Sequence, residues 1–157
     1  MIEIAGPNLC GGYWADPEKT RREFTADGWF RTGDLGRIDC DGYLHIVGRA
    51  KDLVISGGYN VYPKEVEMEL DALSGVAESA VFGVPHPDFG EGVTAVVVPQ
   101  PGIALSEPEM IHALQARLAR YKIPKRVLPI EELPRNTMGK VQKSALRSAY
   151  AALYAKK

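Results

Sequence analysis

The chain has 157 residues, of which 45% are hydrophobic and 25% are charged. This composition is typical of a folded globular protein, and it excludes a disordered tail, a collagen-like repeat and a disulfide-stabilised scaffold. The longest apolar runs are short, so we expect no membrane-spanning helix and, from the first residues, no signal peptide. The net charge of −1 conceals an asymmetry, because residues 1–50 carry −2, residues 51–100 carry −6 and residues 101–157 carry +7.

The basic last third of the chain has two interpretations. It could bind an anionic ligand, or it could be an ordinary solvated helix face. The cysteines, Cys10 and Cys40, lack the spacing of metal ligands, and we expect both to be reduced in a cytoplasmic protein. The histidines, His45, His86 and His112, are far apart, and we expect no metal site.

Glycines and prolines interrupt the first fifty residues at short intervals, which leaves no room for a long helix. Asp16 and Pro17 have the pattern of a helix start, in which a capping carboxylate precedes a proline in the first turn. Asp41-Gly42 lies between two apolar runs and predicts a β-hairpin. We therefore expect short strands and one short helix in this part.

From about residue 52 the pattern changes to strands that alternate with helices. Apolar and β-branched runs predict strands at Leu53–Ile55, Val76–Val84, Val93–Val98 and Arg126–Ile130. The turn-rich residues 85–92 separate the middle two strands.

Three helices are expected from apolar residues at helical spacing. The first begins at Pro63 and buries Val66, Leu70 and Leu73. The second begins at Ser106, which forms a capping box with Glu109, and buries Ile111, Leu114 and Leu118. The third extends from about Lys143 to Tyr154 and buries Leu146, Ala149, Tyr150 and Leu153.

The predicted fold class is α+β, with a small mixed or antiparallel sheet packed by helices. The change in composition places a domain boundary near residues 48–52. We expect a strand-rich part at 1–48, a hinge at 49–52 and a small domain at 53–157.

Four segments contain residues suited to ligand binding, although each could also be an ordinary turn or linker. They are Arg31-Thr32-Gly33-Asp34-Leu35-Gly36, then Gly48-Arg49-Ala50-Lys51-Asp52, then Ser56–Glu65 with its paired glycines, and the loop Leu133–Lys143. A carboxylate such as Asp34 accepts hydrogen bonds from sugar hydroxyls. A loop lysine such as Lys140 can neutralise a phosphate.

In their order and spacing, these segments resemble the carboxyl-terminal end of the acyl-adenylate-forming enzymes. That family includes acyl-CoA synthetases, luciferases and the adenylation domains of peptide synthetases. The resemblance covers nearly the whole chain, from Gly6 to the last helix. Within the family, residues 59–63 and 134–140 are most similar to malonyl-CoA synthetases.

The resemblance implies a ligase that acts in two steps. A carboxylic acid first attacks the α-phosphate of ATP, bound with Mg, and gives an acyl adenylate and pyrophosphate. The thiol of coenzyme A (CoA) then displaces AMP. In this family the small C-terminal domain swings between two positions, one for each half-reaction.

The resemblance also implies roles for individual residues. Asp34 would hold the ribose hydroxyls of ATP, Arg49 would contact the same nucleotide, and Lys51 would occupy the hinge. Lys140 would be the catalytic residue, which stabilises charge during adenylation.

For the second step, the resemblance implies a CoA-binding group. Gly57 and Gly58 would line the channel for the pantetheine arm, with Phe89 against that arm, while Tyr121 and Lys125 would meet the adenine and the phosphates. Some relatives carry a second basic residue where this chain has Ile123, and Arg126 is a candidate to replace it.

The family's large N-terminal domain holds the phosphate loop and the acyl pocket, and neither is in this sequence. We therefore expect residues 1–48 to be a remnant of its β-barrel subdomain and the chain alone to be inactive in adenylation. The alternative is a free-standing, non-catalytic module that binds a nucleotide, CoA or another protein. A nucleic-acid partner is disfavoured by the sequence pI of about 6.3.

Overall fold

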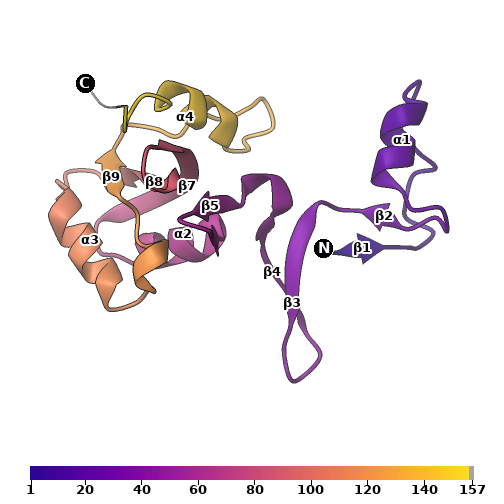
Figure 1. Cartoon of the computed structure of the whole chain (residues 1–157), viewed down its shortest axis with the longest axis horizontal. Coiled ribbons are helices and arrows are strands. Elements are labelled where there is room, and N and C mark those ends of the chain that lie inside the picture. Colours follow the sequence, from indigo (N-terminus) through magenta and orange to yellow (C-terminus); the bar gives the residue numbers. More distant parts are fainter. Residues whose placement is uncertain (156–157) are drawn as a thin grey trace. The chain divides into compact units, whose positions relative to one another are not determined.

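The computed structural model describes residues 1–155. The chain divides into two compact units, Met1–Lys51 and Asp52–Lys157, which we name the first and the second unit (Figure 1). The role of residues 49–52 as a hinge stays a prediction. Among the described residues, no helix combines the length and apolar character that crossing a membrane requires.

The first unit consists of short strands and one helix. β1 (Glu3–Ile4) pairs antiparallel with β2 (Phe30–Arg31), and β3 (Asp34–Ile38) pairs antiparallel with β4 (Leu44–Arg49). A 3-10 turn, η1 (Ala50–Asp52), spans the boundary between the two units. The expected hairpin at Asp41-Gly42 is confirmed, because this dipeptide joins β3 to β4 and Gly42 adopts a φ of 85°.

Helix α1 (Pro17–Glu23) begins where the sequence predicts. The Asp16 carboxylate accepts a hydrogen bond from the backbone N–H of Lys19 at 2.9 Å, which satisfies one of the free donors of the first turn. Pro17 occupies the start of the helix, where its missing N–H has no cost.

The first unit has no buried residue. On the β3–β4 hairpin, four apolar side chains expose more than half of their surface: Ile38, Tyr43, Leu44 and Ile46. Because folding is driven mainly by apolar burial, this unit gains little stability from its own contacts.

The second unit is built on one mixed five-stranded sheet. Its strands are β5 (Val54–Ser56), β6 (Tyr59–Val61), β7 (Val76–His86), β8 (Gly90–Pro99) and β9 (Arg126–Pro129). The strand order is β6-β5-β8-β7, and β9 pairs parallel with β8, whereas the other pairs are antiparallel. The α+β class with a small mixed sheet is therefore confirmed.

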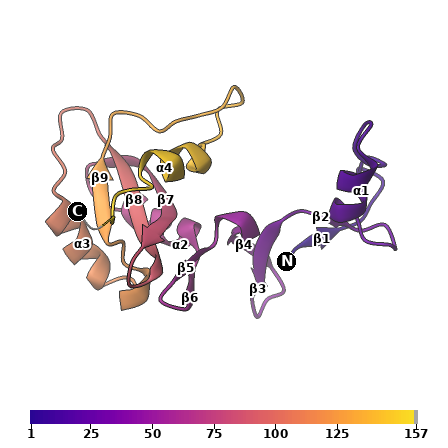
Figure 2. The same cartoon turned by 45° about the horizontal axis from the view of Figure 1, so that its top comes forward.

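Helices cover both faces of this sheet (Figure 2). α2 (Pro63–Asp71) and α3 (Glu107–Gln115) pack on one face with the side chains of Val81, Val93, Ala95 and Val97. α4 (Lys143–Ala149) packs on the other face with Ala80, Phe82, Val84 and Val96. Successive residues of β7 and β8 thus contribute to opposite cores.

Four details differ from the sequence-based expectations. β7 and β8 extend through most of residues 85–92, because Pro85 lies in an edge strand that tolerates a missing N–H. β6 was not expected. The Ser106 side chain makes no capping bond, although Ser106 is the N-cap of α3. α4 ends at Ala149, which is exposed, because Tyr150 and Tyr154 leave the helix to pack on the sheet.

A buried ion pair joins the two faces at the edge strand β7. Glu67 of α2 is 7% exposed, and its Oε1 lies 2.6 Å from Nζ of Lys143 at the start of α4. The same oxygen accepts a hydrogen bond from the backbone N–H of Val81 in β7 at 2.9 Å. This carboxylate is therefore satisfied by two donors from two different elements.

We expect Glu67→Ala to lower the free energy of unfolding by about 3 kcal/mol, because it leaves a half-buried ammonium and a backbone N–H without their acceptor. Urea unfolding followed by circular dichroism measures this loss. The matched control is Glu69→Ala, which removes an exposed partner of Arg117 on the same helix and should cost less than about 1 kcal/mol. Equal losses for the two variants would contradict the prediction.

We also expect the two units to differ in local stability. Amides of β3 and β4 should exchange with solvent at least roughly a hundredfold faster than amides of β7 and β8, since the first unit lacks a buried core. Hydrogen exchange followed by mass spectrometry measures both in one sample. Comparable protection in the two units would refute this expectation.

Candidate functional site

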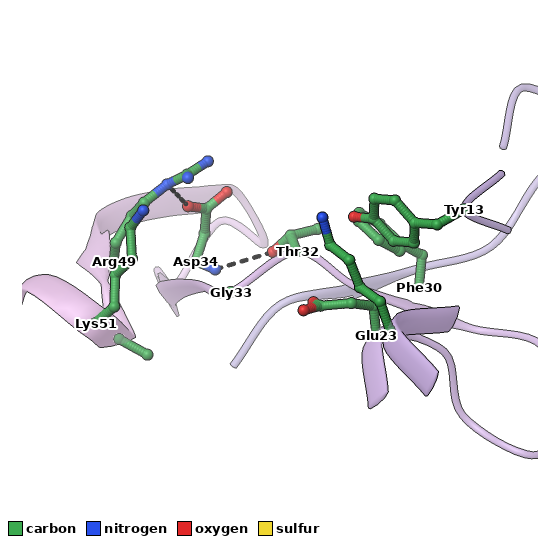
Figure 3. Close-up of a pocket in the computed structure, with 10 residues that line it drawn as sticks. Tyr13, Glu23, Phe30, Thr32, Gly33, Asp34, Arg49 and Lys51 are labelled. Carbon is green, nitrogen blue, oxygen red and sulfur yellow. Dashed lines mark hydrogen bonds and ion pairs between the residues drawn. The ribbon is translucent and has the colours of Figure 1, made fainter. Parts of the chain in front are cut away.

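The two candidate nucleotide-binding residues of the first unit face each other. Asp34 is the first residue of β3, Arg49 is the last residue of β4, and the two are directly paired across the ladder. Nε of Arg49 donates a hydrogen bond to Oδ1 of Asp34 at 2.9 Å (Figure 3). Within residues 1–155 no hydrogen bond reaches Oδ2, so this carboxylate oxygen can still accept bonds from hydroxyl groups.

Asp34 and Arg49 line a hollow of about 630 Å³ together with Lys51. The backbone N–H of Ala50 donates to the carbonyl of Gly33 at 2.9 Å, which holds the two strand ends together. No pattern in the sequence indicates the other side chains of this hollow, Tyr13, Lys19, Glu23, Phe30 and Thr32. Two of them form a cation–π pair, in which Nζ of Lys19 lies 4.0 Å from the centre of the Tyr13 ring.

Gly57 and Gly58 form the two-residue turn between β5 and β6. Their φ angles are 58° and 82°, both in the left-handed region, as a type I′ hairpin turn requires. A Cβ on Gly57 would lie 3.3 Å from the Phe89 ring, whereas a Cβ on Gly58 would meet no atom within 4 Å. Gly58 therefore faces open space, and the turn alone already favours glycine at both positions.

The remaining candidate CoA residues lie around this turn. The backbone N–H of Gly57 donates to the carbonyl of Phe89 at 2.9 Å, and Nζ of Lys125 lies 4.2 Å from the centre of the Phe89 ring. Tyr121, in the 3-10 turn η2 (Arg120–Lys122), stacks on Tyr59 of β6 at 4.7 Å. Tyr59 was not predicted as a site residue, because nothing in the sequence indicates that Tyr59 and Tyr121 share one face.

Lys140 lies in a separate loop. The Asn136 side chain accepts hydrogen bonds from the backbone N–H groups of Met138 and Lys140, and Gly139 has a φ of 76°. These bonds shape a tight turn that presents Lys140 to solvent. Figures 1 and 2 both show this loop, which leads into α4, apart from the β5–β6 hairpin.

The charge asymmetry of the sequence is largely resolved by internal ion pairs. Five basic residues of the last third pair with acidic residues of the segment 51–100: Arg117 with Glu69, Lys122 with Glu65, Arg135 with Glu78, Lys143 with Glu67 and Arg147 with Asp52. The hydrogen bond to Glu65, opposed by burial, raises the pKa of Lys122 above its usual range.

Arg126 is also paired. Its Nε lies 2.8 Å from Oε1 of Glu107, which accepts a second bond from the backbone N–H of Val127. Burial acts to raise the pKa of Glu107, but these two hydrogen bonds outweigh it and lower this pKa. The expectation that Arg126 contacts CoA phosphates stays a prediction, and this ion pair does not favour it.

Three basic residues between positions 101 and 155 have no carboxylate partner in the described part of the chain: Arg120, Lys125 and Lys140. Two of these three are candidate site residues. The structure thus leaves cationic side chains available at the positions where the sequence predicts anionic ligands.

The cysteines and histidines occupy unrelated places. Cys10 and Cys40 are free and exposed, and His45 bonds to Asp39 at 2.6 Å. Within residues 1–155 no three side chains of the types His, Cys, Asp or Glu are grouped so that they could hold a metal ion.

Comparisons with known proteins identify the second unit. Residues 65–140 match the family described as the AMP-binding enzyme C-terminal domain. An acyl-CoA ligase of Rhodococcus jostii that acts on a methyl-dioxo-octahydroindenyl propanoate is 49% identical over 93% of this chain and 28% of its own length. The long-chain-fatty-acid–CoA ligase FadD13 of Mycobacterium tuberculosis is 48% identical over 96% of this chain and 30% of its own length.

A solved structure gives a similar result. ATP-bound MatB of Rhodopseudomonas palustris, a malonyl-CoA synthetase, is 60% identical, with a TM-score of 0.90 over 97% of this chain and 30% of MatB. The apo form of the same protein gives a TM-score of 0.72 over the same share of the chain. The chain spans about 30% of the length of these relatives, and its second unit belongs to the family of AMP-binding enzyme C-terminal domains.

Proposed function

We propose that this chain is part of an ATP-dependent acid–CoA ligase, in which it supplies residues to both half-reactions. The observation that carries the proposal is the set of cations left without carboxylate partners. Lys125 lies over the ring of Phe89, whose carbonyl accepts a bond from the Gly57 N–H. Lys140 lies in the loop that leads into α4, which Figure 2 shows apart from the β5–β6 hairpin. Each is free to meet the phosphates of a different ligand.

In the first half-reaction, a carboxylate oxygen of the acid attacks the α-phosphorus of ATP, and pyrophosphate leaves. Lys140 stabilises the negative charge that develops between the carboxylate and the α-phosphate. Asp34 accepts hydrogen bonds from the ribose hydroxyls through its free oxygen, while Arg49 fixes the carboxylate. In this proposal Mg accompanies ATP as part of the substrate.

In the second half-reaction, the CoA thiol attacks the acyl carbonyl, and AMP leaves. The open space at Gly58 accommodates the pantetheine arm, with Phe89 beside it. The exposed Tyr121 ring offers a face for the adenine, and Lys125 offers an ammonium for a phosphate.

Lys140 and the Gly57–Gly58 turn lie in separate places on one rigid unit, so they cannot both reach the same reaction centre in a single arrangement. The proposed function therefore needs two arrangements of the second unit. Lys51, the last residue of the first unit, is the proposed hinge.

The identity of the acid is not determined by this part of the family. Two relatives that are 49% and 48% identical to this chain are named for a methyl-dioxo-octahydroindenyl propanoate and for long-chain fatty acids. Malonate is the first acid to test because of the similarity to MatB. We place the reaction in the cytoplasm, where the free thiols of Cys10 and Cys40 would stay reduced.

The alternative is a non-catalytic binding module. Such a module needs no unpaired lysine in a loop away from the face that binds its ligand. A requirement for Lys140 therefore distinguishes the ligase from the binding module. Adenylation that depends on Lys140 excludes the module.

We expect Lys140→Ala to reduce adenylation by about a hundredfold or more, because it removes a positioned cation from the charged transition state. The measurement is ATP–pyrophosphate exchange with malonate, in a graft where residues 1–157 replace the matching part of MatB. Lys64→Ala, which removes an exposed lysine of α2, is the matched control. If the graft stays fully active without Lys140, the catalytic role of Lys140 is contradicted. If the 157-residue chain alone catalyses the exchange, the expectation that adenylation requires a large N-terminal domain is contradicted.

We expect Lys125→Ala to raise the KM for CoA about tenfold, since a charge-assisted bond to phosphate contributes about 1.5–3 kcal/mol. Thioester formation by the same graft, assayed at saturating ATP and malonate, measures this constant. Arg117→Ala removes a cation that is already neutralised by Glu69 and should leave the KM unchanged. The same increase in both variants would point to a general charge effect and not to a CoA contact.

A further inference from the structure

A series of aromatic contacts connects the end of the chain to the candidate CoA residues. After α4, residues 150–154 return to the β7–β8 hairpin, and the Tyr154 ring lies 4.7 Å from the His86 ring. The His86 ring lies 4.8 Å from the Phe89 ring. Phe89 in turn carries the ammonium of Lys125 over its face.

Tyr154 is anchored by two features of β8. Its hydroxyl lies 2.9 Å from Oγ1 of Thr94, a completely buried polar side chain. Burial raises the pKa of Tyr154 and keeps its hydroxyl protonated, although the bond to Thr94 acts in the opposite direction. Gly92 provides the room for the ring, because a Cβ there would lie 2.6 Å from Cε2 of Tyr154.

Phe89 depends on such support. It occupies the short turn between β7 and β8, and 37% of its surface is exposed. An aromatic ring in an exposed turn changes rotamer freely unless neighbouring side chains hold it. His86 contacts this ring, and the Lys125 ammonium lies over its face.

We propose that Tyr154 and His86 position Phe89 against Lys125, so that the carboxyl-terminal segment sets the affinity for CoA. This inference rests on the proposed function. Tyr154 and His86 are positioning residues, because the contact with the pantetheine arm is made by Phe89 and the contact with a phosphate by Lys125.

The test uses the same graft and measures the KM for CoA. Tyr154→Ala should raise it about fivefold, and Tyr154→Phe should restore most of the affinity, since the ring touches His86 and the hydroxyl only adds the anchor to Thr94. Gly92→Ala should raise the KM in the same way, because its methyl group displaces the Tyr154 ring from the other side. The adenylation half-reaction, followed by pyrophosphate exchange, is the internal reference.

A matched control separates positioning from a general loss of stability. Tyr150→Leu alters a second aromatic residue of the same segment, which packs on Phe82 and not on His86. It should lower the thermal stability without raising the KM for CoA. In addition, the double variant His86→Ala/Tyr154→Ala should show no larger KM than either single variant if the two residues act as one unit.

A second readout needs no enzymatic activity. In the 157-residue chain, the Phe89 ring current should shift the Lys125 side-chain protons upfield in NMR spectra, and Tyr154→Ala should reduce this shift. An unchanged KM together with an unchanged shift would overturn the proposal, as would an equal KM increase in Tyr150→Leu. If the unsubstituted graft forms adenylate but no thioester, the proposed function fails instead, and the NMR shift still decides whether Tyr154 positions Phe89.

Discussion

The register of the β7–β8 hairpin determines where the candidate CoA residues of the second unit lie. Val81 pairs with Ala95 and faces α2 and α3, whereas Ala80 and Phe82 face α4. A shift of one residue would exchange the two faces and expose both cores. Because β8 also pairs with β5 and β9, the same register brings the Gly57–Gly58 turn, the Phe89 turn and Lys125 to one end of the sheet.

The candidate residues of the second unit lie at turns, but those turns are fixed by neighbouring groups. The Gly57 N–H donates a hydrogen bond to the Phe89 carbonyl, so the two turns that carry candidate CoA residues hold each other in place. Lys140 is held differently, by an Asn136 side chain within its own loop. The proposed function therefore requires the second unit to present these two groups to the reaction centre in turn.

Local features of the fold could be predicted from the sequence, since they depend on neighbouring residues. Asp16 caps α1, and Asp41-Gly42 forms a hairpin because glycine there reaches a left-handed conformation. The contacts of Tyr121 with Tyr59 and of Lys125 with Phe89 could not be predicted, because they join distant residues through the sheet. Likewise, helical spacing extended the last helix to Tyr154, but packing of Tyr154 on Gly92 and Thr94 ends it at Ala149.

The internal ion pairs between the acidic middle and the basic end also affect how ligands approach. Each paired cation lies within 4 Å of a carboxylate that cancels its field, while the Debye length in physiological salt is about 8 Å. The described part of the chain therefore exerts little long-range attraction on a polyanion such as nucleic acid. In the proposed function, Lys125 and Lys140 therefore select their ligands at contact distance, where the shape of the surrounding turn matters as much as the charge.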